Sequence, residues 1–401
     1  MSANTKKISL LLIALIFSLL LLVSCMGTGT VARGWAGISE IDSTLVFASM
    51  TGKVYSVDSA TGAVLGDPIK MVVTASGGLS CIPSCGGQQT TAIAIYASPG
   101  VAGDLVYLGG YNDGKVYAYQ LVDGKLKEEP LWTYPRQGDL GTSIIGGLTI
   151  ADGKLYFGTA NGTVYALTAA EGYKEWSYNI GKKIWSAPAV EGDTLYIGSL
   201  DKKVYALDAA TGAKKWEFET GGAISATPLV KDGKIYIGSY DRHLYALDTS
   251  GKLVWKFPAD DDATDTPRNW FWAKPVIDGD VLYAPCLDGK VYLLNALTGS
   301  FIDAIDLRYD NNKGAISSSP VIVDDNLIVA ITDLAKKTSR IYAIDISNRS
   351  TPRELTSFTE GVNAPLFASN GIVYIHTTKD SFYGLNALSG ALQKFSLTTS
   401  K

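Results

Sequence analysis

A tyrosine returns at near-regular intervals along most of the chain, and this repeat constrains the fold more than any other feature. Its closest spacing is 40 residues, from Tyr165 to Tyr205 and again to Tyr245. The full series is Tyr55, Tyr117, Tyr165, Tyr205, Tyr245, Tyr292, Tyr342 and Tyr383. Repeats of roughly 40 residues with four short strands each are typical of β-propellers. We therefore predict an all-β fold, an eight-bladed β-propeller of four-stranded antiparallel blades, with each tyrosine in a third strand.

The segments between the tyrosines have the composition of strands joined by tight turns. Residues 195–197 and 204–207 are short aromatic and β-branched runs bounded by turn residues. Asn161-Gly162 is one of several pairs that favour a hairpin between second and third strands. A proline recurs near six of the eight predicted first strands, at Pro99, Pro188, Pro228, Pro275, Pro320 and Pro365. Because proline donates no ladder hydrogen bond, it indicates the start or free edge of an innermost strand.

The N-terminus predicts export. Lys6 and Lys7 precede an apolar run over residues 8–23, which ends at Ser24-Cys25. A basic start and a short apolar region are typical of a secretory signal, and the end of the run resembles the lipobox of bacterial lipoproteins. We expect a signal peptide over 1–24, a lipidated Cys25 with a tether over 25–31, and one propeller domain over 32–401. The protein would then be extracytoplasmic and lipid-anchored to a membrane; the alternative is an uncleaved membrane anchor with an incidental cysteine.

The remaining cysteines and the net charge limit the kinds of site and partner that we expect. Cys81 and Cys85 lie close enough in sequence for a local disulfide, which an exported chain permits. Cys286 follows a predicted strand, and we expect a buried, inert thiol there. The formal net charge is −4, from 35 basic and 39 acidic residues, without a basic block. We therefore expect no nucleic-acid partner.

Residues 206–216 read Ala-Leu-Asp-Ala-Ala-Thr-Gly-Ala-Lys-Lys-Trp. This segment resembles the tryptophan-docking repeat of pyrroloquinoline-quinone-type propellers, and weaker copies cover nearly all of the chain after the leader. The resemblance implies eight blades in a monomeric propeller. It also implies a structural role between blades for four tryptophans: Trp132, Trp176, Trp216 and Trp255.

Two branches of that family differ in function. One contains quinoprotein dehydrogenases, which use the quinone and usually calcium. The other contains lipoproteins without a cofactor, such as the propeller subunit of the outer-membrane β-barrel assembly machinery. This sequence has no adjacent cysteine pair and no Cys-x-x-Cys-His haem motif, and no calcium-binding or catalytic set maps onto it. We expect a non-catalytic scaffold that binds other envelope proteins, with no catalytic residue, metal or cofactor. A quinoprotein dehydrogenase with pyrroloquinoline quinone and calcium, or an extracellular sensor or adhesion module, remains the alternative.

Three long insertions indicate where partners would bind. They cover residues 67–91, 258–269 and 308–314, and all join one predicted blade to the next. Alternating strand directions place such connections on one face, and loops on a rigid scaffold often carry binding. The candidate partner-binding residues lie in or beside the second insertion: Asp260, Asp261, Asp262, Asp265, Arg268 and Trp270. We interpret these acidic residues as a solvent-exposed loop rather than a calcium site, because the spacing of the aspartates does not match the known twelve-residue calcium loop.

Some aromatic and histidine residues leave two interpretations open. Tyr96, Trp185 and Trp272 each lie three residues before a first-strand proline. They would either form the wall of a small-molecule pocket or pack between inner strands, and we favour packing. His243 and His376 have no neighbouring nucleophile in the sequence, so we expect incidental surface or hairpin positions.

Overall fold

Eight antiparallel blade sheets follow one another along the described chain; seven have four successive strands in sequence order, and the second has five strands. The structure is a computed structural model that describes residues 36–49, 51–74, 90–259, 266–309, 314–348 and 351–397. Every regular element in these ranges is a β-strand. None of the residues described forms a helix long and apolar enough to cross a membrane.

The first four blades, from the innermost strand outward, are as follows. Blade 1 contains β1 (Ile38–Ile41), β2 (Thr44–Ala48), β3 (Lys53–Asp58) and β4 (Ile69–Lys70); blade 2 contains β7 (Gly100–Ala102), β8 (Leu105–Gly109) and β9 (Val116–Val122), with β10 (Lys125–Leu126) and β11 (Trp132–Tyr134) both paired to β9; blade 3 contains β12 (Thr149–Ala151), β13 (Lys154–Gly158), β14 (Thr163–Thr168) and β15 (Lys174–Asn179); blade 4 contains β16 (Ala189–Glu191), β17 (Thr194–Gly198), β18 (Lys203–Asp208) and β19 (Lys214–Glu219). A two-stranded ribbon of β5 (Val72–Thr74) and β6 (Thr90–Ala92) joins blades 1 and 2.

The second four blades have the same order. Blade 5 contains β20 (Leu229–Lys231), β21 (Lys234–Gly238), β22 (Leu244–Asp248) and β23 (Leu253–Phe257); blade 6 contains β24 (Val276–Asp278), β25 (Val281–Pro285), β26 (Lys290–Asn295) and β27 (Phe301–Asp306); blade 7 contains β28 (Val321–Val323), β29 (Asn326–Asp333), β30 (Thr338–Asp345) and β31 (Arg353–Phe358); blade 8 contains β32 (Phe367–Ser369), β33 (Ile372–His376), β34 (Phe382–Asn386) and β35 (Leu392–Phe395).

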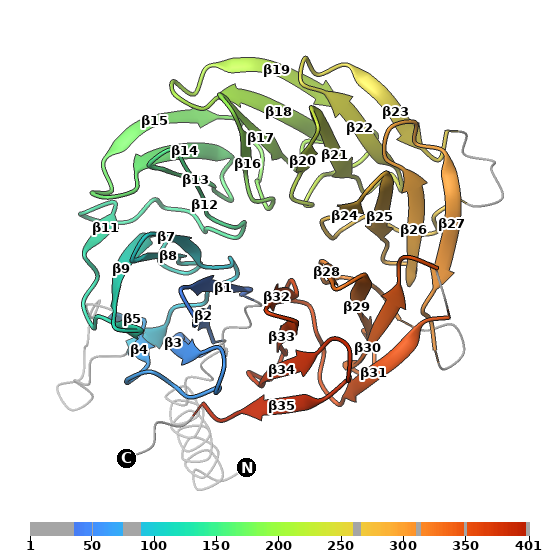
Figure 1. Cartoon of the computed structure of the whole chain (residues 1–401). Coiled ribbons are helices and arrows are strands. Elements are labelled where there is room, and N and C mark those ends of the chain that lie inside the picture. Colours follow the sequence, from blue (N-terminus) through green and yellow to red (C-terminus); the bar gives the residue numbers. More distant parts are fainter. Residues whose placement is uncertain are drawn as a thin grey trace, which may run out of the picture. The chain divides into compact units, whose positions relative to one another are not determined.

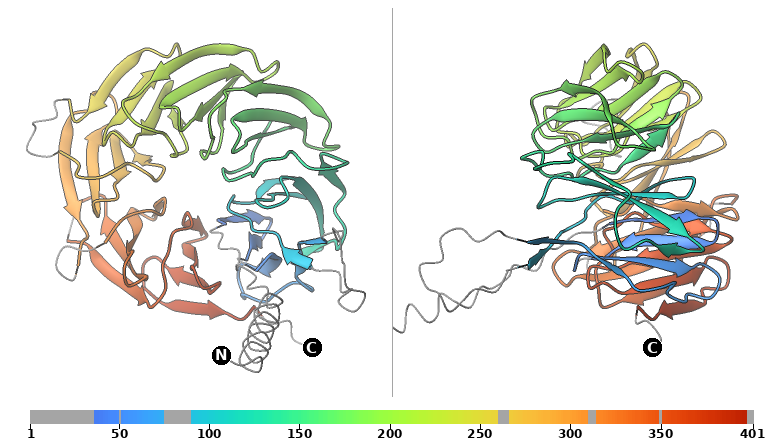
Figure 2. Two further views of the ribbon diagram at one scale, coloured as in Figure 1. Left: turned by 180° about the vertical axis from the view of Figure 1, so that it is seen from behind. Right: turned by 90° about the vertical axis from the view of Figure 1, so that its left-hand side faces the viewer.

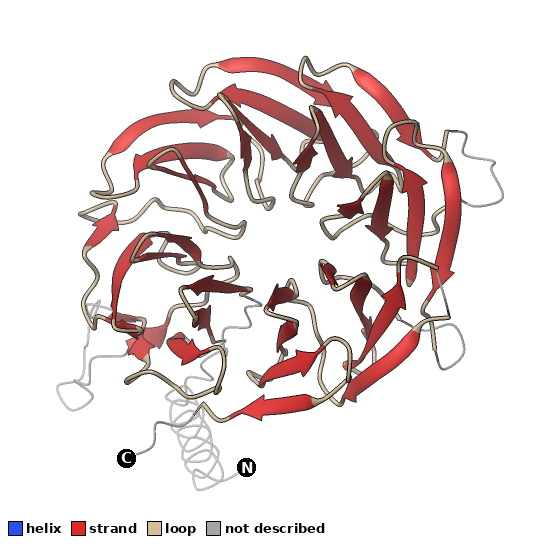
Figure 3. Ribbon diagram, viewed as in Figure 1, coloured by secondary structure: helices blue, strands red, loops and turns tan. Residues whose placement is uncertain are grey.

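The blades stand around a central axis, with the short first strands innermost and the fourth strands outside (Figure 1). Figure 3 shows that strands and tight turns make up all of this ring. The predicted eight-bladed, four-stranded propeller is confirmed, and all eight repeat tyrosines lie in third strands. The split outer edge of blade 2, where β10 and β11 share β9, is the departure from the regular pattern.

The prolines lie just before the first strands rather than within them. Five of them immediately precede their strands, and Pro365 stands two residues before β32. A proline in this position removes no ladder hydrogen bond, which explains why the repeat accepts it there.

The hydrophobic core lies between neighbouring blades. All five residues of β17 are buried, because both faces of a middle strand are covered. One core cluster joins Tyr196 and Val204 of blade 4 with Ile235 and Leu247 of blade 5. A blade on its own would expose both of its apolar faces, and the blades pack together into one compact unit over Ala32–Lys401.

The ring closes without a strand shared between the terminal blades. Blades 1 and 8 are separate sheets, and the rings of Phe47 and Phe382 stack across their boundary with centroids 4.2 Å apart. The Tyr374 hydroxyl donates to the Ser59 carbonyl oxygen at 3.1 Å. Phe395 lies in the outermost strand of the last blade.

Candidate functional site

One face of the propeller carries all connections between blades, and we call it the connection face. Because the strands of each blade alternate in direction, the turns between second and third strands lie on this face too. The described ends of the three insertions predicted from the sequence therefore lie on it. The ribbon of β5 and β6 belongs to the first insertion and projects away from the blades (Figure 2).

Several predicted site residues lie outside the described residues: Cys25, Cys81, Cys85, Asp260, Asp261, Asp262 and Asp265. Arg268 and Trp270 are described, and both are exposed. Of the predicted partner-binding set, the structure thus places the two residues nearest to blade 6.

The segment around Arg268 and Trp270 is held firmly against its own blade. The Arg268 backbone N–H donates to Asp288 Oδ2 at 2.9 Å, and the Leu287 N–H donates to the Trp270 carbonyl at 3.0 Å. The Trp270 ring stacks on Tyr240 of blade 5, with centroids 4.3 Å apart and planes only 4° apart. Trp270 still exposes 41% of its surface. This arrangement presents a large aromatic side chain to solvent in a fixed orientation.

The four predicted docking tryptophans each reach the next blade. Trp132, Trp176 and Trp255 are buried, and each indole N–H donates to a backbone carbonyl in the following blade, namely that of Ala169, Ala209 or Ala296, at 3.0–3.2 Å. Trp216 makes the corresponding bond to the Thr249 carbonyl at 2.8 Å in a more exposed setting. Their rings lie against turn glycines of those blades, close enough that a Cβ would stand 2.4–2.5 Å from the ring.

A second donor to the same carbonyls was missed by sequence reasoning. The hydroxyls of Tyr107, Tyr156 and Tyr236, all in second strands, donate to the carbonyls that accept from Trp132, Trp176 and Trp255. The recurring Tyr-x-Gly at the end of the second strand was the available signal. Between blades 8 and 1 the ring of Phe395 lies against Gly62 instead, so a phenylalanine occupies the tryptophan position there.

A cavity of about 350 Å³ lies in the channel. Its wall is formed mainly by residues that precede first strands, so it lies toward the connection face. Tyr96, Trp185 and Trp272 all line this cavity. The packing role that we favoured for these three aromatics is therefore wrong: the first strands are too short to cover side chains that enter the channel before the sheet begins.

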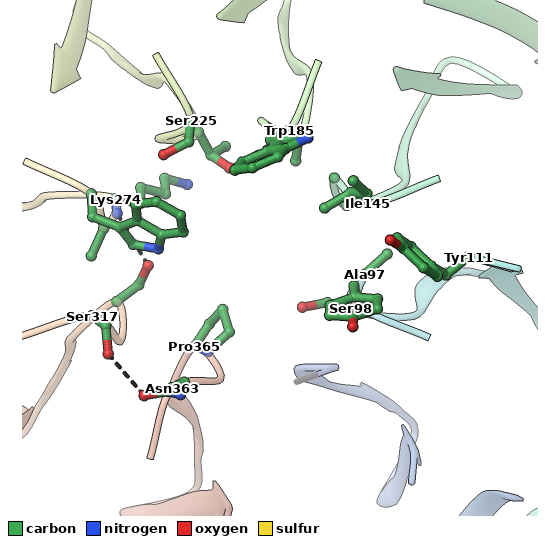
Figure 4. A pocket seen from close by; sticks show the side chains of 18 residues that line it. Ala97, Ser98, Tyr111, Ile145, Trp185, Ser225, Lys274, Ser317, Asn363 and Pro365 are labelled. Carbon is green, nitrogen blue, oxygen red and sulfur yellow. Dashed lines mark hydrogen bonds between the residues drawn. The ribbon is translucent and has the colours of Figure 1, made fainter. Parts of the chain in front are cut away.

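Four aromatic rings line the cavity, and Figure 4 labels two of them, Trp185 and Tyr111. Trp185 and Trp272 meet edge to face at 6.5 Å, and Trp272 also stacks on Tyr240 at 5.7 Å. Tyr96 and Tyr111 pack against each other at 4.8 Å. The same aromatic series therefore runs from the exposed Trp270 to the interior of the channel.

Lys274 is the charged side chain among the eighteen residues that line the cavity. The rest of the wall is aromatic, apolar, or neutral polar in character, with hydroxyls that include Ser98, Ser225 and Ser317. Burial lowers the pKa of the Lys274 ammonium below its ordinary value. No ion pair of Lys274 is found within the described part of the chain.

The two histidines and the cysteine in the described ranges have structural positions. His376 is buried at the end of β33, where Nδ1 contacts the Ala36 carbonyl at 3.1 Å and Nε2 contacts Asp380 Oδ1 at 3.2 Å. His243 is also buried and lies beside Asp241. The hairpin positions expected for them are correct, but the surface position is wrong. Cys286 is buried, and burial raises the pKa of its thiol well above the ordinary value, as expected for an inert cysteine.

The cavity does not fit calcium-dependent quinone chemistry. Calcium prefers several carboxylate and carbonyl oxygens, whereas no Asp or Glu is among the cavity-lining residues. Across the described ranges there is no cluster of three or more His, Cys, Asp or Glu side chains suited to a metal ion. We therefore derive no redox step for this site.

Comparisons with known proteins agree with the fold. A solved structure of BamB from Moraxella catarrhalis is 20% identical, with a TM-score of 0.61 over 86% of this chain and 92% of that one. A computationally designed protein, Ika8, has a TM-score of 0.64 at 16% identity, over 92% of this chain and 98% of that one. A europium-containing methanol dehydrogenase has a TM-score of 0.55 at 14% identity, over 73% and 77%. At these identities the structures show a shared propeller fold.

Two sequence comparisons are more specific. The putative dehydrogenase XoxF of Paracoccus denitrificans is 37% identical over 92 residues, which are 21% of this chain and only 15% of that protein's length. A family match covers far more, because residues 33–183 and 160–394 both match one and the same propeller family. The chain therefore belongs to the family described as outer membrane protein assembly factor BamB.

Proposed function

We propose that this chain is a non-catalytic scaffold that binds other envelope proteins through its connection face, while a lipid on Cys25 holds it at an extracytoplasmic membrane surface. The family match supports the class of function. The observation that best supports this binding face concerns Trp270, which is exposed yet held in place by stacking on Tyr240 and by backbone hydrogen bonds to its own blade.

A fixed aromatic side chain is well suited to partner binding. Tryptophan, tyrosine and arginine dominate the energetics of protein interfaces, and Arg268 lies two residues from Trp270. Because the ring is already ordered by stacking, a partner would not have to immobilise it, which lowers the entropy lost on docking. Trp270 and Arg268 would therefore form the centre of the interface.

The test compares capture of envelope partners by the full-length, membrane-anchored chain and its variants after cross-linking in cells. We expect W270A to weaken capture by roughly 30-fold or more, as a hot-spot residue would, and R268A to weaken it less. Y173A is the matched control, because Tyr173 is an exposed aromatic in the turn between β14 and β15 on the opposite face. Capture that is unchanged by W270A but lost with Y173A would place the interface on the face opposite to the connection face and refute the proposed binding face.

The anchor has a separate test. Ser24-Cys25 after an apolar run motivates it. C25A should abolish labelling by a fatty-acid probe and leave an unprocessed precursor. Equal labelling of C25A and the wild-type chain would refute lipidation at this residue without affecting the proposed interface.

A quinoprotein dehydrogenase is the second candidate, and the local match to the putative dehydrogenase XoxF favours it. The two candidates differ in a direct measurement. The scaffold proposal expects no quinone absorbance and no dye-linked oxidation of alcohols or sugars after addition of pyrroloquinoline quinone and calcium. Turnover under those conditions would favour the dehydrogenase.

A further inference from the structure

We propose that a pocket between blades 8 and 1 binds a tryptophan side chain presented by a partner polypeptide. This closure pocket has a volume of about 470 Å³ and lies where the first and last blades meet (Figure 1). It is lined by residues of β33, β34 and β35 in blade 8 and by Ser43, Ser59 and Ala60 in turns of blade 1. These turns lie on the face opposite to the connection face, so the closure pocket is separate from the surface around Trp270.

Blade 8 lacks the docking tryptophan of blades 2 to 5. In each of those blades the tryptophan pairs with an alanine of the third strand, whereas the corresponding pair in blade 8 is Gly384 with Gln393. Gln393 is exposed, and its side-chain amide donates to the Thr61 carbonyl at 3.1 Å. The ring of Phe395 lies against Gly62, but a phenyl ring is smaller than an indole and has no N–H. The closure pocket borders this substituted position, because Gly384, Gln393 and Phe395 all line it.

The acceptor for an indole N–H is already in place. In three other interfaces one carbonyl accepts from both a tyrosine hydroxyl and an indole, as the Ala209 carbonyl does from Tyr156 and Trp176. Ser59 holds the corresponding position in blade 1. Its carbonyl accepts from the Tyr374 hydroxyl at 3.1 Å, and no indole donates to it within the described part of the chain. A carbonyl oxygen has two lone pairs, so Ser59 can accept a second hydrogen bond.

The boundary between blades 7 and 8 shows how the chain itself can replace a missing tryptophan. There the Arg353 guanidinium of β31 donates to the carbonyls of Ala387 and Leu388 at 3.3 and 2.9 Å. Ala387 corresponds to Ala209, since each follows the residue whose carbonyl accepts from the turn glycine. A second donor is therefore a regular feature of this position. At Ser59, a tryptophan from another polypeptide would supply it.

The lining of the closure pocket suits both parts of a tryptophan residue in a peptide. Ile372, Tyr374 and Phe395 provide an apolar surface on which an indole can pack. Ser43 and Asn370 are exposed at the pocket, and their side chains can bond the main-chain amides of a peptide. No charged side chain is among the described residues that line it. A neutral, flat side chain with one N–H donor therefore fits better than a charged group.

The experiment titrates N-acetyl-5-fluorotryptophan amide into the purified full-length protein and follows the probe by fluorine NMR. The protein contains no fluorine, so the signal reports the probe alone. We expect saturable binding. Methylation of the indole nitrogen should weaken it roughly fivefold, because the hydrogen bond to the Ser59 carbonyl is lost. 5-Fluoroindole, which lacks the main-chain amides, should bind more weakly than the capped residue, and binding at least as tight would contradict a polypeptide as the source.

Variants locate the bound probe. Q393W supplies an indole from within the chain and should abolish probe binding. D303W is the matched control, because Asp303 is exposed and lies opposite Leu293 at the corresponding position of blade 6; it should leave binding intact. I372K places a charge on the apolar surface and should weaken binding at least about tenfold. Blade 3 has Lys154 at the corresponding position, so we expect the fold to accept this change.

Thermal midpoints show which variants are folded. No saturable binding by the wild-type chain, equal affinity for the methylated probe, or equal binding by Q393W and D303W would each overturn the proposal. If Q393W does not fold, unchanged binding by folded I372K overturns it instead. W270A should bind the probe as the wild-type chain does, so a failure at the closure pocket can be told apart from a failure of the interface proposed on the connection face. Loss of probe binding in W270A would show that the probe reports a different surface and would also overturn the proposal.

Discussion

The carbonyl of Ala209 offers a sharp test of how neighbouring blades are held together. It is buried and accepts two hydrogen bonds from blade 3, one from the Tyr156 hydroxyl and one from the Trp176 indole, each at 3.0 Å. Y156F or W176F alone removes one donor and leaves the other. Each lost bond should lower the free energy of unfolding by about 1 kcal/mol, with a further loss in W176F from its smaller ring.

The loss of unfolding free energy in the double variant should differ from the sum of the losses in the two single variants. With both donors gone, the carbonyl is buried without either partner, and an unsatisfied buried polar group costs about 1–3 kcal/mol. We therefore expect the loss in Y156F/W176F to exceed the sum of the single losses by about 1 kcal/mol or more. Groups that share one partner are expected to be non-additive in this way.

Urea denaturation measures this coupling, provided that the slope of the transition is unchanged among the variants. W216F is the control, since Trp216 packs against a turn glycine in the same manner but donates to the exposed Thr249 carbonyl. It should lose less stability than W176F. Additive losses in the Tyr156–Trp176 cycle, or an equal loss in W216F, would refute the idea that the shared buried carbonyl stabilises the contact between blades.

Three further predictions concern other contacts. Gly212 has φ +75°, and a Cβ there would stand 2.5 Å from a buried ring, whereas Gly192 has φ +57° and open space around it. G192A should lower the free energy of unfolding by roughly 1 kcal/mol from backbone strain alone. Thermal denaturation should show that G212A lowers it by well over that amount. Burial raises the pKa of Asp241, but hydrogen bonds from His243 and others outweigh it and lower this pKa to about 2. Because the pKa of Asp241 is lower in the folded state than its ordinary value of 3.8, this carboxylate stabilises the protein at pH values above 3.8. The contribution is lost as the pH falls from 3.8 toward 2. Denaturation at a series of acid pH values should therefore show a decrease of up to about 2 kcal/mol in the free energy of unfolding, and D241N should lack this decrease. Cys286 should resist alkylation in the native state and react only after unfolding, and rapid native labelling would contradict its burial.

The repeat determined the architecture without help from tertiary structure. The turn from Asp208 to Gly212 illustrates why: Asp208 Oδ1 accepts from the Thr211 N–H and hydroxyl at 2.9 and 2.7 Å, and Gly212 adopts a positive φ. These interactions join residues only a few positions apart, so the residue types by themselves indicate the turn. Eight such units with strand-like segments between them leave the propeller as the architecture that buries both faces of every sheet.

The contacts between blades could be predicted only in part. The tryptophans were recognisable from the repeat, but the donation of Tyr156 to the carbonyl that Trp176 also uses depends on the register between two sheets, which the sequence does not state. The face that carries the connections between blades followed from the alternation of strand directions. The stacking of Trp270 on Tyr240 did not, because the two residues belong to different blades.

The cavity was decided by tertiary structure alone. Tyr96 and Trp272 are far apart in the chain, and they face one channel only because the ring closes between blades 8 and 1. In the sequence, Lys274 is an ordinary lysine before a proline, and nothing there indicates that it lines a cavity. Its position in a neutral, largely aromatic wall depends on six other blades, none of which brings a carboxylate to that wall. Local sequence determines turns and strands, whereas the chemistry of a channel depends on the sum of residues that only the closed ring brings together.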